Sequence, residues 1–392
     1  MTQKEIDDRI DRLMTRFDEV NSYFIQKVAE QVMRIGELNA SSVNVITIMA
    51  SMVFDIADIN RRIAQAAMLS VADVHQLYKD IIESEEASPR FERALKETPL
   101  TPNDKGRVMQ YVESVSRQTA GTMYNLSNTT LVSETYRHTV DNAILAVSSG
   151  MGDYNSAVRQ SIKELGYNGL QMQYPSGCHR RLDTAVRQNV IDGANQVAQH
   201  GSEIIGEKLK YDAVELSAHA RSAPDHEPVQ GRVFLKEEFA KMQAGEDFVD
   251  IDGHHYAGFR RPIGEWNCMH IQRPFSTQYS KRQFSDEQLK EWAEANAKGC
   301  EIDGKHYTIY EAAQLMRQME TQVRRWKDTA NAARAAGDDT LRQQCQENIN
   351  SLVRQYDEVA KASGMRPRRE RMRVEGFKMV KVQPQPQKQA AS

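Results

Sequence analysis

The chain has 392 residues, 40% of them hydrophobic and 27% charged, and a formal net charge of −3. This composition is that of an ordinary soluble protein of two or three domains. The near-neutral charge excludes a molecule that attracts nucleic acid or membrane over its whole surface. The most apolar run, Val43 to Phe54, is shorter than the roughly 20 residues of a membrane span, and we expect neither a membrane helix nor a secretory signal. Four dispersed cysteines without a C-x-x-C pair predict reduced thiols in a cytoplasm.

Residues 1–150 are predicted to form long helices. Thr2 and Glu5 fit a capping box at the start of the first helix. After them, apolar residues recur at steps of three and four, at Ile6, Ile10, Leu13, Phe17, Val20, Phe24, Val28, Val32 and Ile35. This spacing places a narrow apolar stripe along a helix about 50 Å long. Because such a stripe needs a partner, we expect it to pack on this chain or on a neighbouring subunit.

Residues 151–284 are predicted to form a small α+β core. Ser156 is expected to cap a helix that Gly166 ends, and a further helix is expected over 181–200. From 210 to 308 the sequence is rich in glycine and proline, with short strand-like runs. Two of these runs, IDGHHY (251–256) and IDGKHY (302–307), place Asp-Gly between strand residues, which predicts two similar tight hairpin turns.

Residues 285–365 predict an antiparallel helical hairpin. Capping boxes begin at Ser285 and at Thr308, and apolar stripes follow over 309–333 and 341–359, separated by Gly337. Cys345 falls on the second stripe, so we expect it to be a packed core residue. The predicted class is therefore α+β and mostly helical, with long N-terminal helices, a small Gly/Pro-rich core and a C-terminal hairpin.

Residues 366–392 are predicted to be a basic, partly disordered tail. Eight Lys and Arg residues stand against Glu370 and Glu375, and the end, QPQPQKQAAS, has a disordered composition. A mobile basic tail can contact DNA phosphates, although a solvated tail is the commoner interpretation. The arginines that could make such contacts are Arg366, Arg368, Arg369, Arg371 and Arg373.

Titratable residues gather in LSAHARSAPDHEPVQGRVF (216–234) and in GEWNCMHIQRPF (264–275). The candidate zinc ligands are His219, His226, Cys268 and His270, with Cys178 or His179 as further possibilities. C-x-H is a workable ligand pair, but the gap between His219 and His226 is wider than the two to four residues usual in structural zinc sites. We therefore predict no cofactor here and retain zinc as the alternative.

Two enzymatic interpretations compete with a structural one. A His-Asn-His nuclease built from His226, Asn267 and His270 fails on the spacing of these residues. Nucleophilic catalysis by Cys268 requires a nearby imidazole, and His270 is expected to point away from the thiol. We predict no catalytic residue. The structural interpretation is that prolines and glycines fix the turns while His219, Arg221 and Gln230 satisfy buried backbone groups; Trp266, Phe234 and Phe275 fill the interior.

These residues resemble the phage minor capsid protein 2 family. The family pattern is carried by Ser217, His219, Arg221, Pro224, His226, Gln230, Gly231, Phe234, Trp266, Asn267, Cys268 and His270. The similarity extends to YPSGCHRRLDTAVRQNV (174–190) and DGKHYTIYEAAQLMRQMETQVRRWK (303–327), so it covers about residues 120–375. The same residue pattern is also similar to that of Mu-type head morphogenesis proteins. Met269 stands where the family has arginine in W-N-C-R-H, which favours a packing role.

The resemblance implies a structural minor capsid protein of a tailed bacteriophage, made in the host cytoplasm and carried in the virion head. It implies low copy number and association with the portal, the major capsid protein or both, with residues 1–150 as the expected contact region. Packaged DNA is a further expected partner through the basic tail, and no membrane is expected. The alternative is a metal- or Cys-dependent enzyme, hydrolase-like or nuclease-like, carried in the phage head.

Overall fold

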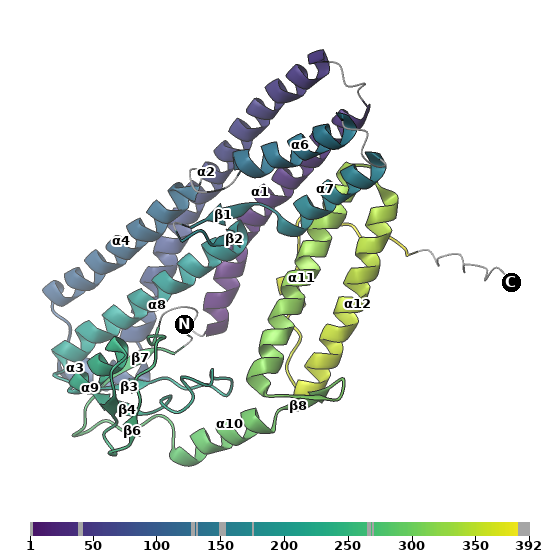
Figure 1. Ribbon diagram of the computed structural model, residues 1–392. Helices are drawn as coiled ribbons and strands as arrows, with labels where there is room; N and C mark the ends of the chain where they lie inside the picture. Colours follow the sequence, from purple (N-terminus) through teal and green to yellow (C-terminus); the bar gives the residue numbers. More distant parts are fainter. Residues whose placement is uncertain are drawn as a thin grey trace. The chain divides into compact units, whose positions relative to one another are not determined.

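The structure is a computed structural model that describes residues 3–37, 42–126, 130, 132–148, 154–174, 176–264, 268 and 270–382. Helices dominate it, and its strands are short and antiparallel (Figure 1). This confirms the predicted mostly helical α+β class. Among the helices described, none combines the length and apolar character needed to cross a bilayer.

The chain forms two compact units, which are described separately. Unit 1 comprises Met1–Met14, Ala67–Asn125 and Val186–Ala313, and unit 2 comprises Thr15–Ala66, Leu126–Ala185 and Gln314–Ser392. The helices are α1 (Gln3–Glu37), α2 (Ser42–Glu86), α3 (Pro89–Glu97), α4 (Pro102–Tyr124), α6 (Val132–Ser148), α7 (Tyr154–Asn168), α8 (Leu182–Lys208), α9 (Lys236–Ala244), α10 (Asp286–Lys298), α11 (Ile309–Ala335) and α12 (Asp339–Ser363), with a short 3-10 helix η1 (Arg369–Met372). The strands are β1 (Gln171–Gln173), β2 (His179–Arg181), β3 (Ala213–Leu216), β4 (Val233–Leu235), β5 (Phe248–Val249), β6 (His255–Tyr256), β7 (Gln272–Phe275), β8 (Cys300–Ile302) and β9 (Lys305–Tyr307).

The apolar stripe of α1 is covered by the chain itself. Phe17, Phe24, Val28 and Val32 are fully buried, and Ile10 is 1% exposed. Of the two expected arrangements, packing on this chain or on a neighbouring subunit, the structure shows the first. The predicted cap Thr2 lies outside the described residues.

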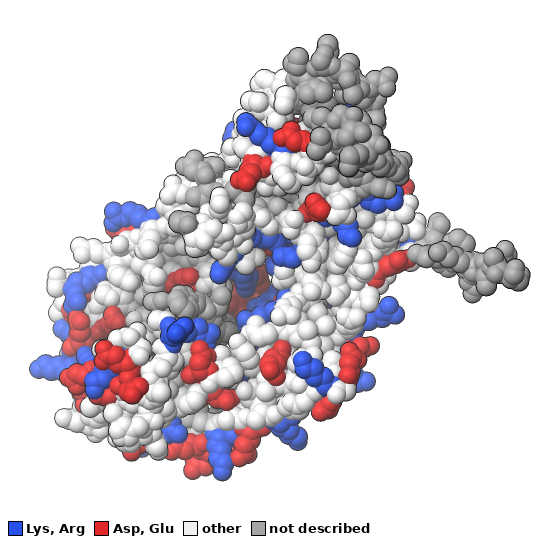
Figure 2. Space-filling model, viewed as in Figure 1, with Lys and Arg blue, Asp and Glu red and all other residues white. Residues whose placement is uncertain are grey.

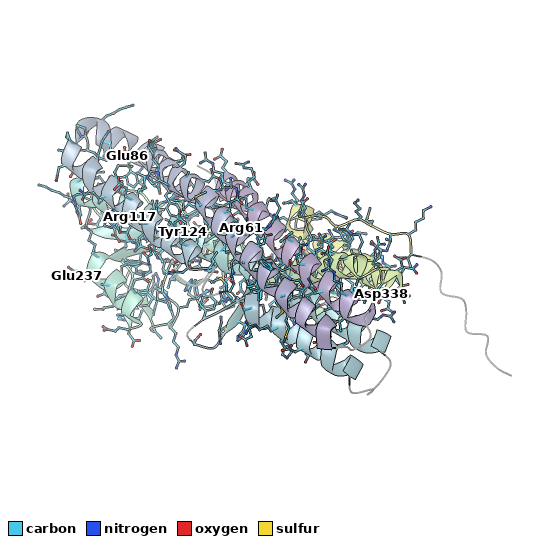
Figure 3. All side chains as sticks on the ribbon, turned by 90° about the horizontal axis from the view of Figure 1, so that it is seen from above. Arg61, Glu86, Arg117, Tyr124, Glu237 and Asp338 are labelled. Atoms are coloured by element: carbon cyan, nitrogen blue, oxygen red, sulfur yellow. The ribbon has the colours of Figure 1, made fainter. Side chains whose placement is uncertain are left out.

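Unit 1 is built on α4, α8 and the C-terminal part of α2. The buried Tyr78 hydroxyl donates to the Val190 carbonyl at 3.1 Å and lies 3.1 Å from the Thr119 hydroxyl, which joins the three helices. The Tyr111 and His200 rings stack with centroids 3.8 Å apart, so α4 and α8 run side by side (Figure 1). Figure 3 labels Glu86 and Tyr124, the last residues of α2 and α4. Helix α8 extends to Lys208, beyond the predicted end at residue 200.

Unit 1 also holds a small sheet with strand order β4-β3-β7, antiparallel throughout. Glu215 pairs with Val233 on one side and with Arg273 on the other. Leu216, Phe234 and Phe248 belong to one buried apolar cluster beneath it. The predicted Gly/Pro-rich segment is thus loop-rich and contains this three-stranded sheet, the helices α9 and α10 and the two hairpins β5–β6 and β8–β9.

The two Asp-Gly runs form different turns. In β8–β9, Ile302 pairs with Lys305, and both Asp303 (φ 52°) and Gly304 (φ 73°) have the positive φ of a tight two-residue turn, as predicted. In β5–β6, Val249 pairs with His255, so the loop spans 250–254 and the prediction of a tight turn is wrong. The Asp250 carboxylate explains the difference, because it accepts hydrogen bonds from the backbone N–H groups of Asp252 and His254 at 3.0 and 2.9 Å.

In unit 2, α7 packs closely on α11. Helix α7 begins at Tyr154, before the predicted cap Ser156, and runs through Gly166 to Asn168. Gly166 therefore does not end the helix, contrary to prediction. A Cβ there would collide with the backbone of Thr329, so glycine lets the two helices approach. The left-handed residue after the helix is Gly169, at φ 60°.

The predicted helical hairpin is present as α11 and α12, which lie side by side (Figure 1). Thr308 and Glu311 form the predicted capping box, and the Asp338 side chain caps α12 by accepting from the Leu341 N–H. The Tyr356 hydroxyl donates to Glu320 at 2.9 Å, which joins the late part of α12 to the early part of α11, as an antiparallel pair requires. Cys345 is fully buried between them, as predicted.

Candidate metal centre

The candidate residues meet at one end of the three-stranded sheet. Strand β3 ends at Leu216, and its antiparallel neighbours β4 and β7 begin at Val233 and Gln272. The loop that leaves β3 and the segment that enters β7 therefore lie at the same end of the sheet. This topology brings His226, in the β3–β4 loop, to Cys268 and His270, although about forty residues of sequence separate them.

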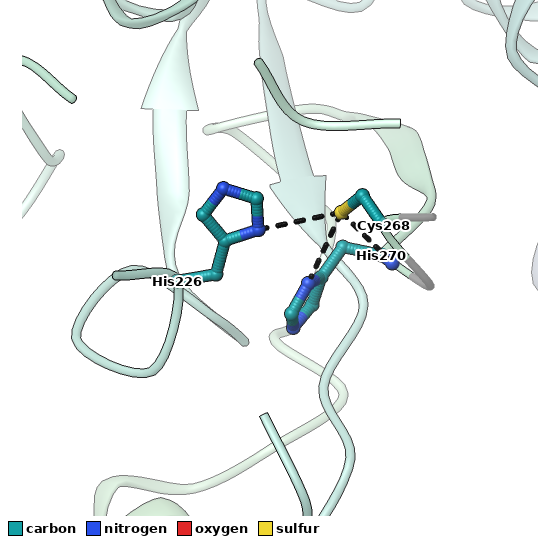
Figure 4. A group of neighbouring side chains, drawn as sticks. All are labelled: His226, Cys268 and His270. Carbon is teal, nitrogen blue, oxygen red and sulfur yellow. Dashed lines mark hydrogen bonds between the residues drawn. The ribbon is translucent and has the colours of Figure 1, made fainter. Parts of the chain in front are cut away.

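Three of the four predicted zinc ligands form a compact group (Figure 4). The Cys268 Sγ lies 3.3 Å from His226 Nδ1 and 3.5 Å from His270 Nδ1. All three side chains are buried, and one ligating atom of each lies within 4.8 Å of the others. The expectation that His270 points away from Cys268 is wrong, because both side chains turn into the same corner. His219 does not join the group; its ring stacks on His270, with centroids 4.6 Å apart.

Hydrogen bonds on the far side of each imidazole define its tautomer. His226 Nε2 lies 2.8 Å from the Arg261 carbonyl, which can only accept, so Nε2 carries the proton. The Gln230 side-chain oxygen accepts from the His219 N–H at 2.9 Å and lies 3.3 Å from His270 Nε2, so this nitrogen also donates. Both Nδ1 atoms therefore present a lone pair toward Cys268.

Burial keeps all three groups uncharged. Desolvation, with smaller effects from His219, His226 and Arg261, lowers the pKa of His270 to about 2. Burial likewise lowers the pKa of His226 and raises the pKa of the Cys268 thiol. A nucleophilic cysteine requires the reverse, an exposed and electropositive site that favours thiolate. The geometry therefore suits binding or packing better than nucleophilic catalysis.

Sequence reasoning missed two residues of this corner. The Ser222 hydroxyl lies 3.3 Å from His270 Nε2, and Arg261 places its Nη2 atom 3.4 Å from His226 Nδ1. Arg261 also forms a two-point ion pair with Asp225, at 2.7 and 3.0 Å. No local motif marks Arg261, because it reaches the corner from a turn 35 residues after His226.

The remaining family-motif residues have structural positions. Ser217 exchanges two hydrogen bonds with the backbone of Ile271, both at 2.8 Å, and so closes the sheet end. Gly231 has φ 66°, and Phe234 is fully buried. Arg221 and Pro224 are exposed. Trp266 and Asn267 lie outside the described residues.

The other predicted candidates lie apart from this group. Cys178 is exposed and His179 is the first residue of β2, both in unit 2. Of the tail arginines, Arg369 pairs with Asp357 at 2.7 Å and Arg371 with Glu320 at 4.0 Å; Arg366, Arg369 and Arg373 are exposed. On the face shown in Figure 2, acidic and basic side chains are intermixed. Contact of the tail with DNA stays a prediction.

Comparison with known proteins gives one match. The family model described as phage minor capsid protein 2 matches residues 2–359, which span both units and the metal-centre candidates. No curated protein and no solved structure matches the chain. The match confirms the resemblance and gives the chain a structural role in the phage virion, among other head proteins. The chain belongs to the phage minor capsid protein 2 family.

Proposed function

We propose that this protein is a low-copy head component at the portal vertex, where it contacts the portal protein, the major capsid protein or both. The observation that carries the proposal is the family match over residues 2–359. A shell protein on a symmetric lattice is present in many equivalent copies. A component present in few copies needs a position that the lattice does not repeat, and the portal vertex is such a position.

Within the expected contact region, residues 1–150, helix α2 exposes an apolar surface that we assign to the partner. Because the α1 stripe is buried, it cannot serve a partner without unfolding the chain. On α2, Val53 is 60% exposed, Phe54 is 77% exposed and Met49 is 46% exposed. These three residues, here called the α2 apolar patch, lie in unit 2; Met49 and Val53 are one helical turn apart, and Phe54 follows Val53 in the chain. Large exposed apolar side chains that lie together mark interaction surfaces.

Quantitative mass spectrometry of purified phage particles and of DNA-free proheads tests the proposal. A few copies per particle in both preparations, with cross-links to the portal protein, is the expected result. A copy number close to that of the major capsid protein would contradict the vertex location. Absence from both preparations would remove the structural role altogether and return the enzymatic alternative to consideration.

A further inference from the structure

We propose that His226, Cys268 and His270 bind one zinc ion, which ties the β3–β4 loop to the segment that enters β7. The three residues come from two segments that no other covalent link joins near this point. Zinc accepts imidazole nitrogen and thiolate sulfur together, and a tetrahedral S/N site is typical of this metal.

The spacing of the ligating atoms fits a tetrahedral ion. With Zn–S and Zn–N bonds of about 2.3 and 2.0 Å, sulfur and nitrogen ligands of a tetrahedron stand about 3.5 Å apart. The two observed separations from Cys268 Sγ are 3.3 Å to His226 Nδ1 and 3.5 Å to His270 Nδ1. Both separations from the sulfur therefore match those of a zinc site, and all three ligating atoms lie within 4.8 Å of one another.

The surroundings orient the ligands as metal sites require. Each imidazole uses Nε2 to donate, His226 to the Arg261 carbonyl and His270 to Gln230, which leaves both Nδ1 lone pairs for a metal. The backbone N–H of His270 points at Cys268 Sγ, at 3.4 Å, and such a donor stabilises a thiolate. Gln230 is itself held by the N–H of His219.

Without a metal the same atoms are poorly matched. The Cys268 thiol has one proton for two imidazole lone pairs, and Arg261 places a further donor 3.4 Å from His226 Nδ1. That guanidinium group is already paired with Asp225 at 2.7 Å. A zinc ion would replace these long contacts with three coordinate bonds and release the thiol proton.

The position of the corner indicates a structural ion. His226, Cys268 and His270 are at most 3% exposed, so a substrate has no direct approach. The sheet beside them has only three short strands, and a small loop-rich core of this kind gains stability from a metal cross-link. Among the described residues no other His, Cys, Asp or Glu joins the group, so these three side chains are the ligands that we assign.

The test uses the full chain, purified in buffers free of added metal and chelator. Plasma mass spectrometry should find about one zinc per folded chain. After removal of zinc, addition of Co²⁺ should produce the near-ultraviolet thiolate-to-cobalt band and the intense visible bands of a four-coordinate ion. Cys268→Ser should abolish the thiolate band, whereas Cys345→Ser, at an equally buried cysteine in α12, should retain it.

Gln230→Leu gives a second variant that keeps all three ligands. It removes the acceptor that orients His270, so zinc affinity should fall about 10–100-fold, as for other residues that support metal ligands. A wild-type chain that is folded by circular dichroism but carries no zinc and develops no cobalt bands would overturn the proposal. The proposal would also be overturned if folded Cys268→Ser bound as much zinc per chain as the wild type and gave the same cobalt spectrum. The wild-type measurement decides the matter if that variant does not fold.

Discussion

Five charged side chains meet in the interior of unit 2. Arg181 contacts Asp328 at 2.7 Å and Asp183 at 3.3 Å, and Arg324 lies 3.4 Å from Asp183. Asp18 belongs to the same electrostatic group. Three carboxylates and two guanidinium groups leave one negative charge when all are ionised. Burial, followed by the charge of Asp183, raises the pKa of Asp18 to about 8, and burial also raises the pKa of Asp328. We assign the proton that removes the excess charge to Asp18, because Asp328 is paired with Arg181 at 2.7 Å.

A carboxylate in an ordinary salt bridge stabilises the fold less as pH falls, whereas the protonated Asp18 stabilises it less as pH rises. The folded chain retains a proton that the unfolded chain releases near the usual pKa of 3.8. Stability therefore falls as pH rises above that value, until the raised pKa of the folded state is reached. Asp18→Asn mimics the protonated form. Urea unfolding should show little difference from wild type at pH 4 and a more stable variant at pH 8.

The matched comparison is Asp183→Asn. Burial alone would raise the pKa of Asp183, but Arg181 and Arg324 overcome this and hold it below its usual value. Loss of that carboxylate removes one partner from the buried Arg181 and one from the partly exposed Arg324, at a cost of about 3–5 kcal/mol at neutral pH. An Asp18→Asn effect of the same size at pH 4 and pH 8 would show that Asp18 does not carry the proton.

Substitution by alanine should have opposite effects on stability at two helical glycines. At Gly166 a Cβ would collide with the Thr329 backbone, so Gly166→Ala should destabilise the chain by about 1–3 kcal/mol or more. At Gly121, in α4, a Cβ meets nothing within 4 Å, so Gly121→Ala should stabilise by up to about 1 kcal/mol. Thermal and urea unfolding of both variants check the pair. Equal effects at the two sites would contradict the close approach of α7 and α11.

At the scale of elements, the segment 366–382 is a strap along the helical hairpin. Lys327, Asn331 and Arg334, which share one face of α11, donate to the carbonyls of Met372, Glu375 and Gly376 at 2.7, 2.9 and 2.8 Å. Met372 is 3% exposed. The described part of the basic tail is therefore packed, because a row of donors at helical spacing holds its backbone. Residues 383–392, whose composition predicts disorder, lie outside the described residues.

Removal of the strap should weaken the hairpin. Truncation after Met365 removes the buried Met372 side chain and the three carbonyl groups that accept from α11. The free energy of unfolding should therefore fall by at least about 2 kcal/mol. Truncation after Val382 keeps every strap contact and is the matched control. Urea unfolding measures both. If the shorter chain is as stable as the control, the strap contributes nothing, and its arginines are available for DNA.

At the scale of the whole molecule, the α2 apolar patch provides a test of assembly that leaves folding intact. Val53→Ser with Phe54→Ser changes two exposed side chains, so the unfolding free energy should change by no more than about 0.5 kcal/mol per site. If the patch binds a head protein, the loss of contact energy should be about 2 kcal/mol or more, and fewer copies should enter each particle.

The measurement is the copy number per particle when the variant complements a phage that lacks the wild-type gene. Met379→Ser is the control, because Met379 is 80% exposed but lies in the strap. Wild-type incorporation of the double variant would exclude the α2 apolar patch as the contact surface. Removing residues 1–38 would be less informative, because it deletes core residues such as Phe17 and Phe24 along with any surface.

Short-range features were predictable from the sequence. The stripe of α1, the Thr308 capping box, the tight turn at Asp303-Gly304 and the antiparallel hairpin all depend on residues a few positions apart. The family pattern is likewise a set of residue types at short spacings, and the family match confirms it. Steric and hydrogen-bonding preferences act over these distances, so the helices and their caps could be assigned without the fold.

The tertiary structure decided whatever depends on partners distant in the sequence. It covers the α1 stripe within the chain, assigns Gly166 to helix packing and folds the strap onto α11. It also turns His226 and His270 toward Cys268, with Arg261 behind them. No local preference specifies these arrangements. They follow from strand order and from burial, which bring residues more than forty positions apart into one corner and exclude water from it.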